Sequence, residues 1–222
     1  MRHLIIAAIA ILIPQERNEA EELFKKMEEK ILSAKTLQIR FHGTREPGKL
    51  HLAGDLKLNE GNKSRIVVKS GKAGDAVTTT VIVDGKTLVH STTKGSAGFD
   101  APESLEKLQR ISVARAGLNA TYEASVDEGS AKADAERAFI VKEFTLGVRE
   151  KVGERQGQAI EYKLARKYEA GTKVVVWIDV ETHLPLKRTL TLGPRTMTEY
   201  YSSFKLDEKL EVSQFEHPKE GK

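Results

Sequence analysis

The stretch KVVVWIDVETHLPLKRTL, residues 173–190, decides the fold class of this chain. Residues 173–179 and 185–192 are rich in β-branched and other apolar residues, and the short segment VETHL separates them. Two such runs around a short polar segment predict a β-hairpin. Asp179 is placed to cap the turn with its side chain, and Pro185 stands at a strand start, where a missing N–H is tolerated. The C-terminal half is therefore expected to be antiparallel β-structure.

The same two-residue period recurs on both sides of this hairpin. Asp84-Gly85, between two apolar runs, is the strongest short-range hairpin signal in the chain. Gly54 interrupts one run and predicts a bulge or bend there. Further strands are predicted at residues 37–41, 50–58, 64–70, 77–83, 86–91, 140–148, 160–164 and 196–204. About ten strands at a spacing of roughly ten residues predict an up-and-down sheet or barrel.

Two segments have a helical period instead. Apolar residues recur at three- and four-residue steps in NEAEELFKKMEEKILSAK, residues 18–35, which predicts an amphipathic helix. Residues 93–100 are rich in Gly, Ser and Thr and predict a loop. Asp100 and Glu103 have the spacing of a capping box, so a second helix is expected to begin there. The Ala-rich continuation makes residues 101–138 a helical insert in the series of strands.

The N-terminus has the pattern of an export signal. The apolar run Leu4–Ile13 is ten residues long, which is too short to span a bilayer as a helix and typical of the central region of a secretion signal. The alternative is a buried first strand or helix. We expect residues 1–15 to be a signal peptide, residues 16–215 a single domain, and residues 216–222 a polar tail.

Composition limits the classes of partner. The chain has 222 residues and no cysteine, which excludes disulfides, thiol catalysis and a lipid-modified N-terminal cysteine. An exported protein without disulfides fits the periplasm of a bacterial envelope. The net charge is +4, from 36 Lys and Arg against 32 Asp and Glu, and the two signs are interleaved along the chain. This pattern indicates a solvated surface, so no nucleic-acid partner is expected.

No catalytic motif stands out in the sequence. The six histidines are scattered singly, so neither a metal site nor a cofactor is expected. Ser104–Lys107 fits the pattern S-x-x-K, but its companion motifs are absent and a first helical turn explains it. Gly95–Gly98, GSAG, has the wrong spacing for a nucleophile elbow. Paired carboxylates stay open as an alternative because nothing marks two of them. The prediction is a protein that is not an enzyme and has no catalytic residues.

Several segments resemble the LolA-like superfamily of periplasmic lipoprotein carriers and lipoprotein-sorting relatives. In residues 19–43 a helix ends in Lys-Thr-Leu and leads into the first strand. Residues 81–91, VIVDGKTLVHS, are similar to the family's DGK-T-L hairpin, and residues 173–190 to its W-I-D-x-x-T-x-L-P hairpin. Residues 200–218 end like the family's terminal strand and F-x-x-P. The order and spacing of these segments together support the resemblance more strongly than any one segment alone.

The resemblance implies a mainly β fold with helices: an incomplete, strongly curved antiparallel barrel with a helical lid over a hydrophobic cavity. In the carriers, that cavity accepts the acyl chains of a lipoprotein. The implied function is an envelope protein that binds a lipid or lipoprotein acyl chain, with a possible envelope protein partner. We expect a monomer that does not span the membrane when mature. This chain departs from the family by its greater length and by the insert at 101–138, which leaves the ligand's identity open.

The candidate cavity residues are large apolar residues of the predicted strands: Leu37, Ile39, Phe41, Leu52, Leu56, Ile66, Val68, Val81, Phe144, Tyr162 and Trp177. Periodicity by itself favours a packed core, since nearly every half-buried sheet alternates in this way, and the cavity follows only from the resemblance. For Trp177, the only tryptophan, a place in the plain core is the alternative. The second functional hypothesis is an interaction or regulatory protein of the same fold with a filled core, like the RseB-type sensors.

Overall fold

The structure, a computed structural model, describes residues 18–48, 50–72, 75–126, 139–166 and 169–217. The helices are α1 (Glu19–Ser33), α2 (Leu105–Arg115) and α3 (Leu118–Val126), and a short 3-10 helix, η1 (Val212–Phe215), follows the last strand. The strands are β1 (Thr36–Glu46), β2 (Leu50–Asn59), β3 (Lys63–Lys72), β4 (Asp75–Asp84), β5 (Thr87–Thr92), β6 (Gly95–Asp100), β7 (Ile140–Val152), β8 (Arg155–Arg166), β9 (Glu169–Asp179), β10 (Pro185–Leu192) and β11 (Arg195–Leu206). The predicted signal peptide and residues 127–138 of the predicted insert lie outside the described residues.

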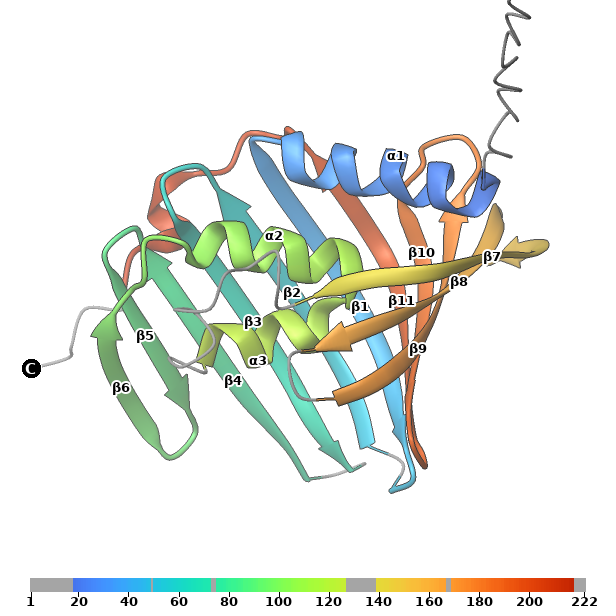
Figure 1. Cartoon of the computed structure of the whole chain (residues 1–222). Coiled ribbons are helices and arrows are strands. Elements are labelled where there is room, and N and C mark those ends of the chain that lie inside the picture. Colours follow the sequence, from blue (N-terminus) through green and yellow to red (C-terminus); the bar gives the residue numbers. More distant parts are fainter. Residues whose placement is uncertain (1–17, 49, 73–74, 127–138, 167–168, 218–222) are drawn as a thin grey trace, which may run out of the picture.

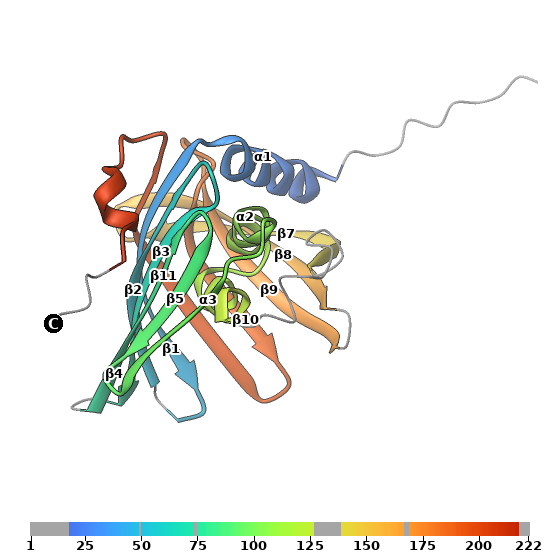
Figure 2. The same cartoon turned by 90° about the vertical axis from the view of Figure 1, so that its left-hand side faces the viewer.

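All eleven strands form one antiparallel sheet in the order β6-β5-β4-β3-β2-β1-β11-β10-β9-β8-β7. Two meanders, β1–β6 and β7–β11, are joined where β1 pairs with β11. The strands β6 and β7 are the two ends of this order, so the sheet is not closed into a barrel. Figures 1 and 2 show how strongly the sheet curves around the helices. The predicted fold class, a curved and incomplete antiparallel barrel with helices, is confirmed.

The strand that the sequence did not predict is β6. Residues 93–100 were expected to be a loop, but Gly95–Asp100 pairs with β5 along its whole length. All six side-chain positions of β6 are exposed, so the apolar alternation by which a strand is recognised is missing. The predicted capping box is also wrong, because Asp100 ends β6 and α2 begins only at Leu105. The residue at the N-cap position of α2 is Ser104, and its side chain makes no capping hydrogen bond.

The first helix forms as its period predicts. The side chain of Asn18 accepts from the backbone N–H of Ala20 and Glu21 and so satisfies two unpaired donors of the first turn. The buried stripe is Ala20, Phe24, Met27 and Ile31. The ring of Phe24 lies 5.1 Å from that of Phe144 and 5.0 Å from that of Tyr162, measured between centroids. These aromatic contacts fix α1 across one end of the sheet, above β7 and β8 (Figure 1).

The helices α2 and α3 lie against the concave face of the sheet. Figure 2 shows both helices between the wall formed by β2–β5 and the wall formed by β8–β10. The apolar residues of α2 and α3 belong to the same core cluster as the inward side chains of both meanders. The described part of the predicted insert, up to residue 126, therefore fills the hollow side of the sheet. On the opposite, convex face, η1 packs through the buried Phe215 against β3 and β4.

Gly54 is not a bulge, since its pairing with β1 and β3 is regular. Its lack of a side chain makes room for Phe41: a Cβ at Gly54 would lie 2.9 Å from Cε1 of the Phe41 ring and 2.2 Å from the carbonyl oxygen of Val67. We therefore expect Gly54→Ala to lower the free energy of unfolding by about 1–3 kcal/mol, as overpacking does. Urea denaturation checks this. Gly98→Ala, on the exposed strand β6 where a Cβ would meet only Val89 Cγ2 at 3.9 Å, separates the steric cost from general glycine effects. Equal losses at both positions would contradict the steric explanation.

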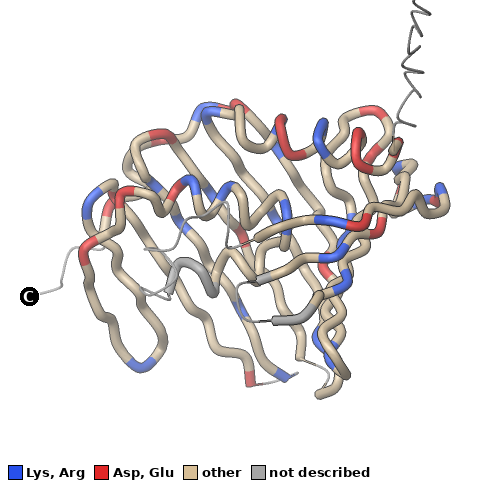
Figure 3. Tube along the Cα trace, viewed as in Figure 1, with Lys and Arg blue, Asp and Glu red and all other residues tan. Residues whose placement is uncertain are grey.

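Charged residues of both signs are interspersed over α1, the strands and the turns, as Figure 3 shows. Among the described residues, the basic side chains are thus not separated from the acidic ones along the trace. In the part of the chain that the structure describes, no helix combines the length and the apolar character needed to cross a bilayer.

Candidate functional site

The candidate site is the concave face of the sheet together with the hairpin formed by α2 and α3, here called the α2–α3 hairpin (Leu105–Val126). The strands place most of the sequence-predicted cavity residues on this face, where they pack into the core cluster. Those buried there are Leu37, Ile39, Phe41, Leu52, Leu56, Ile66, Val68, Val81 and Tyr162. In this conformation they contact one another and the helices. They form a continuous apolar wall, and the α2–α3 hairpin covers it.

Phe144 and Trp177 have different surroundings. Phe144 is half-buried at the edge of the cluster, with its ring 5.8 Å from that of Tyr162. Trp177 lies on the convex face, since its neighbours Val176 and Ile178 point inward with no exposed surface. The ammonium of Lys187 stands 4.0 Å from the centroid of the indole ring on that outer side. The prediction that Trp177 faces the cavity is therefore corrected: alternation along β9 turns it away.

The α2 helix is buried on nearly all sides, which is unusual for a helix with polar residues. Its buried residues include Gln109, Arg110 and Ser112 beside the apolar ones. A buried polar group is costly unless it is hydrogen-bonded. Gln109 Nε2 donates to Ser64 Oγ of β3 at 3.1 Å, and the hydroxyl of Thr121 in α3 donates to Ser112 Oγ at 3.2 Å. These polar groups thus have partners in the core and fix the position of the hairpin.

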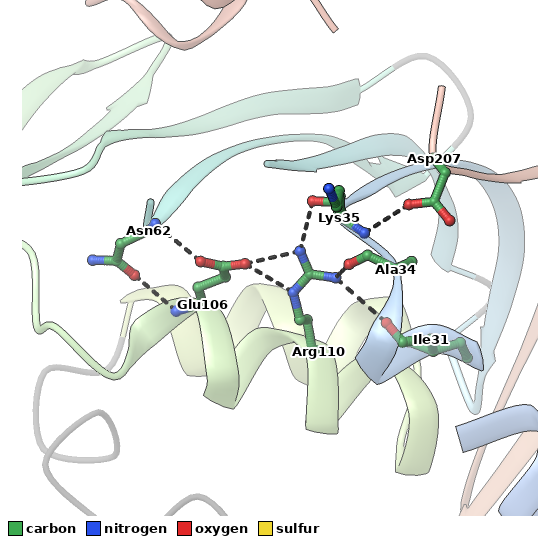
Figure 4. Close-up of polar contacts among 7 residues, drawn as sticks. All are labelled: Ile31, Ala34, Lys35, Asn62, Glu106, Arg110 and Asp207. Atoms are coloured by element: carbon green, nitrogen blue, oxygen red, sulfur yellow. Dashed lines mark hydrogen bonds and ion pairs between the residues drawn. The ribbon is translucent and has the colours of Figure 1, made fainter. Parts of the chain in front are cut away.

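Arg110 joins the hairpin to the end of α1 (Figure 4). Its Nη1 donates to the carbonyl oxygens of Ala34 at 2.5 Å and Ile31 at 3.4 Å, and its Nη2 donates to that of Lys35 at 3.0 Å. Its Nε donates to Glu106 Oε1 at 2.9 Å within the same helix. The last carbonyls of a helix lack intrahelical partners and carry partial negative charge. One buried guanidinium therefore caps the C-terminus of α1.

Glu106 continues this contact to the sheet. Its Oε2 accepts from the backbone N–H of Asn62 at 3.0 Å, and its own N–H donates to Asn62 Oδ1 at 2.8 Å. Asn62 stands in the turn between β2 and β3, so the start of α2 is tied to that hairpin. Figure 4 shows the chain of contacts from Asn62 through Glu106 and Arg110 to the end of α1.

Arg188 anchors the other end of α2. It stands on β10 with no exposed surface. Its Nη1 donates to the carbonyl oxygen of Val113 at 2.9 Å and to the hydroxyl of Tyr201 at 3.1 Å, and its Nη2 donates to the carbonyl oxygen of Ala114 at 2.8 Å. A second buried guanidinium thus caps the C-terminus of α2, as Arg110 does for α1.

Glu199 of β11 caps the N-terminus of α3 in the same place. Its carboxylate accepts from the backbone N–H of Leu118 at 3.1 Å and of Asn119 at 3.0 Å, and from the hydroxyl of Tyr201 at 2.7 Å. Gly117 between the helices has φ +99°, and a Cβ there would lie 2.5 Å from Glu199 Oε2. Glycine therefore lets the chain turn tightly against both buried charges. The helix dipoles explain the arrangement, with the cation at a C-terminus and the anion at an N-terminus.

Burial and neighbouring groups keep Arg188, Tyr201 and Tyr162 each in one protonation state at neutral pH. Burial raises the pKa of Tyr162 to about 12, and it also raises the pKa of Tyr201 well above its ordinary value. Burial lowers the pKa of Arg188, but Tyr201, Tyr162 and Glu199 beside it raise that pKa further than burial lowers it. At neutral pH the phenols are therefore neutral donors and the guanidinium is charged. The hydroxyl of Tyr162 donates to the carbonyl oxygen of Arg115 at 2.5 Å.

A pocket opens on the concave side next to α3, here called the mouth pocket. Its volume is about 160 Å³. Its apolar walls come from the turn after α2, from α3, from the residue before β7, and from β8 and β10: Ala116, Ala120, Phe139, Leu164, Leu190 and Leu192. A cavity of about 150 Å³ lined by apolar side chains holds a molecule the size of benzene. The mouth pocket therefore accepts a short apolar group, and a whole acyl chain needs the space that the hairpin occupies.

Sequence reasoning missed Arg110, Arg188 and Glu199. A signal existed for Glu199, since it is a charged residue between Met197 and Tyr201 at an inward-facing position of a predicted strand. Within the described ranges, no three His, Asp or Glu side chains gather as a metal site would require. The polar groups of the site cap helix ends rather than converge on a substrate position.

No protein-family model and no curated protein matches this chain. The structure is similar to the crystal structure of LprF from Mycobacterium bovis, with a TM-score of 0.54 and 9% identity over 87% of this chain and 95% of that one. It is also similar to the lipoprotein LppX from Mycobacterium tuberculosis, with a TM-score of 0.50 and 11% identity over 86% and 98% of the two chains. A LolA superfamily protein from Nitrosomonas europaea matches at 12% identity over 89% and 97%, with a TM-score of 0.38. The matches to LprF and LppX, which extend over most of both chains, bear out the LolA-like fold predicted from the sequence motifs.

Proposed function

We propose that this chain is an exported, non-catalytic protein of the envelope that binds the acyl chain of a lipid or lipoprotein on the concave face of its sheet. The ligand takes the place of the α2–α3 hairpin, which withdraws to admit it. The observation that carries this proposal is the way the hairpin is held. Arg110 in the middle of α2, and Arg188 and Glu199 at the turn between α2 and α3, fix it through hydrogen bonds with backbone groups, while the wall behind it is continuous apolar surface.

The mixed surface of the hairpin supports its role as a movable element. A helix pair that only filled a core would do so best with apolar side chains, because buried polar groups bring little net stability. Gln109, Arg110, Ser112 and Thr121 are all buried here. In the withdrawn state these groups return to water, which lowers the cost of exposing the hairpin. The same groups, hydrogen-bonded in the core, give the hairpin one defined docked position.

The free energy gained by burying an acyl chain can be compared with the cost of breaking the hairpin's hydrogen bonds. Each buried CH₂ of an acyl chain contributes about 0.8 kcal/mol, so a chain of about ten buried carbons contributes about 8 kcal/mol. That matches the cost of breaking about three to five charge-assisted hydrogen bonds, each worth about 1.5–3 kcal/mol. An acyl chain can therefore offset the loss of several of the hairpin's anchors, whereas a small polar molecule cannot.

Export and the absence of catalysis are further parts of the proposal. The apolar run Leu4–Ile13 with its short length supports export, and the lack of cysteine fits the periplasm. The buried charged side chains of the site are hydrogen-bonded to helix ends, which supports a role in binding rather than in catalysis. We also propose that the protein acts as a monomer, with a possible second envelope protein that delivers or receives the ligand.

One observation favours a second function, that of an interaction or regulatory protein with a filled core. The predicted cavity residues are packed in the core, and the mouth pocket holds only about 160 Å³. If the hairpin never withdraws, the chain is an interaction or regulatory protein with a filled core, and its partner contacts the outside of the sheet.

Binding of a labelled acyl chain separates these two functions. We expect a fluorescent fatty acid to bind with a dissociation constant in the micromolar range, and native mass spectrometry after gentle purification to show lipid bound to the protein. Trp177 lies on the convex face, so its emission should change little on binding and serves as an internal check that the fold is intact. Purification without lipid and no measurable binding of the fatty acid would favour the filled-core function instead.

A further inference from the structure

The rim of the mouth pocket carries two arginines, Arg45 of β1 and Arg195 of β11. We infer that the mouth pocket binds the anionic end of an amphiphile: its carboxylate or phosphate contacts the two rim arginines, and the first carbons of its chain enter the pocket. The inference rests on the proposed function and deepens it, since it names the class of lipid-like ligand.

The strand register brings the two guanidiniums to one place. Arg45 pairs with Met197 of β11, and Arg195 lies two residues before Met197 on the same face of that strand. Diagonal neighbours on one face of an antiparallel pair lie about 7–8 Å apart. Arg45 reaches inward, because its Nη2 donates to Asn119 Oδ1 of α3 at 3.3 Å. Two long side chains at this spacing can both contact one anionic group.

The charge of the rim arginines is not compensated by a carboxylate within the described ranges. The partner of Arg45 is a neutral amide oxygen, and neither rim arginine has an ion pair among those found there. Arg110, Arg115 and Arg155, by contrast, each pair with a carboxylate. Guanidiniums favour carboxylate and phosphate groups because their planar forks match the two oxygens. The rim therefore has the chemistry of an anion site.

The apolar walls of the mouth pocket indicate that the bound anion carries an apolar chain. Phe139, Leu164, Leu190 and Leu192 line the same pocket as the arginines. Its volume of about 160 Å³ has room for the first carbons of a chain. A free inorganic anion leaves these walls uncovered, and a neutral lipid leaves the positive charge of the guanidiniums without a counter-ion. A molecule with an anionic head and an alkyl chain satisfies both parts, and its remaining carbons require the withdrawal of α3.

The test compares four probes that share one decyl chain: decanoate, decyl phosphate, decanol and decyltrimethylammonium, titrated into the full chain below their micelle concentrations. We expect the two anions to bind at least about tenfold more tightly than decanol, and the cation to bind no better than decanol. The variant Arg45→Gln/Arg195→Gln should lower the affinity for the anions to that for decanol and leave decanol binding unchanged. Arg195→Gln alone, at an exposed position that does not endanger folding, should give part of this loss.

The matched control is Arg40→Gln/Lys69→Gln, which removes the same charge from exposed positions on the convex face. It should keep the preference for anions. Equal affinity of all four probes, or the same loss in the control, overturns the inference while the proposed function stands. Displacement of decyl phosphate by inorganic phosphate at a similar concentration also overturns it, because the site is then one for free anions. If no decyl probe binds, the proposed function itself fails.

Discussion

Replacing Arg188 by methionine is expected to remove about 3–5 kcal/mol from the free energy of unfolding, which is the cost of breaking a buried charge pair from one side. The substitution leaves Glu199 as a buried anion and leaves the carbonyls of Val113 and Ala114 without donors. Domains of this size have a total stability of about 5–15 kcal/mol, so about a fifth of it or more depends on one side chain. Urea denaturation followed by circular dichroism and by Trp177 emission measures the loss.

A double-mutant cycle shows that the loss comes from the network and not from the missing volume. Glu199→Gln alone should also destabilise, but Arg188→Met/Glu199→Gln should cost less than the sum of the two single changes by about 0.5–3 kcal/mol. Arg188→Lys keeps the charge and loses the fork, so an intermediate value is expected. The exposed Arg40→Met is the control and should change stability by less than about 0.5 kcal/mol. Additive losses would contradict the capping role argued for the pair.

The strands and α1 could be predicted from the sequence because their signals are local. Asp84-Gly85 and the VETHL turn connect runs with a clear period, and the backbone N–H groups of Glu181 and Thr182 both donate to the Asp179 carboxylate at 2.8 Å. The stripe of Phe24, Met27 and Ile31 likewise fixed which face of α1 is buried. Where one face of an element packs on the core and the other is exposed to water, the apolar period identifies both the element and its buried face.

The parts that could not be predicted lack such a contrast. Trp177 follows three valines, so every neighbour is apolar and the run does not show which face is inward. A bulge between Pro185 and Lys187 shifts the register of β10, so counting along the chain does not place Arg188 inside. A helix was predicted in the insert, but α2 is buried on nearly all sides, so no broad polar face shows which side meets the sheet. That the α2–α3 hairpin fills the concave face is a fact of tertiary packing.

Replacing Arg110 by methionine is expected to tighten acyl-chain binding while it weakens the fold. The change removes the hydrogen bonds to Ile31, Ala34 and Lys35, so the docked hairpin loses an anchor worth about 2–3 kcal/mol. If ligand binds only when the hairpin has withdrawn, its apparent dissociation constant is the intrinsic one divided by the fraction of withdrawn molecules. A loss of about 2–3 kcal/mol raises that fraction about 30- to 150-fold, until it approaches one.

The measurement is the dissociation constant of a fluorescent fatty acid for the unchanged chain, for Arg110→Met and for Lys26→Met. Lys26 is exposed on α1, so its replacement removes one positive charge without touching the hairpin and should leave the affinity as it is. At the same time, Arg110→Met should have the lower urea midpoint. Opposite changes in affinity and stability are the mark of a hairpin that competes with the ligand for the concave face. If the affinity falls together with the stability, the closed form is the one that binds, and the displacement mechanism is wrong.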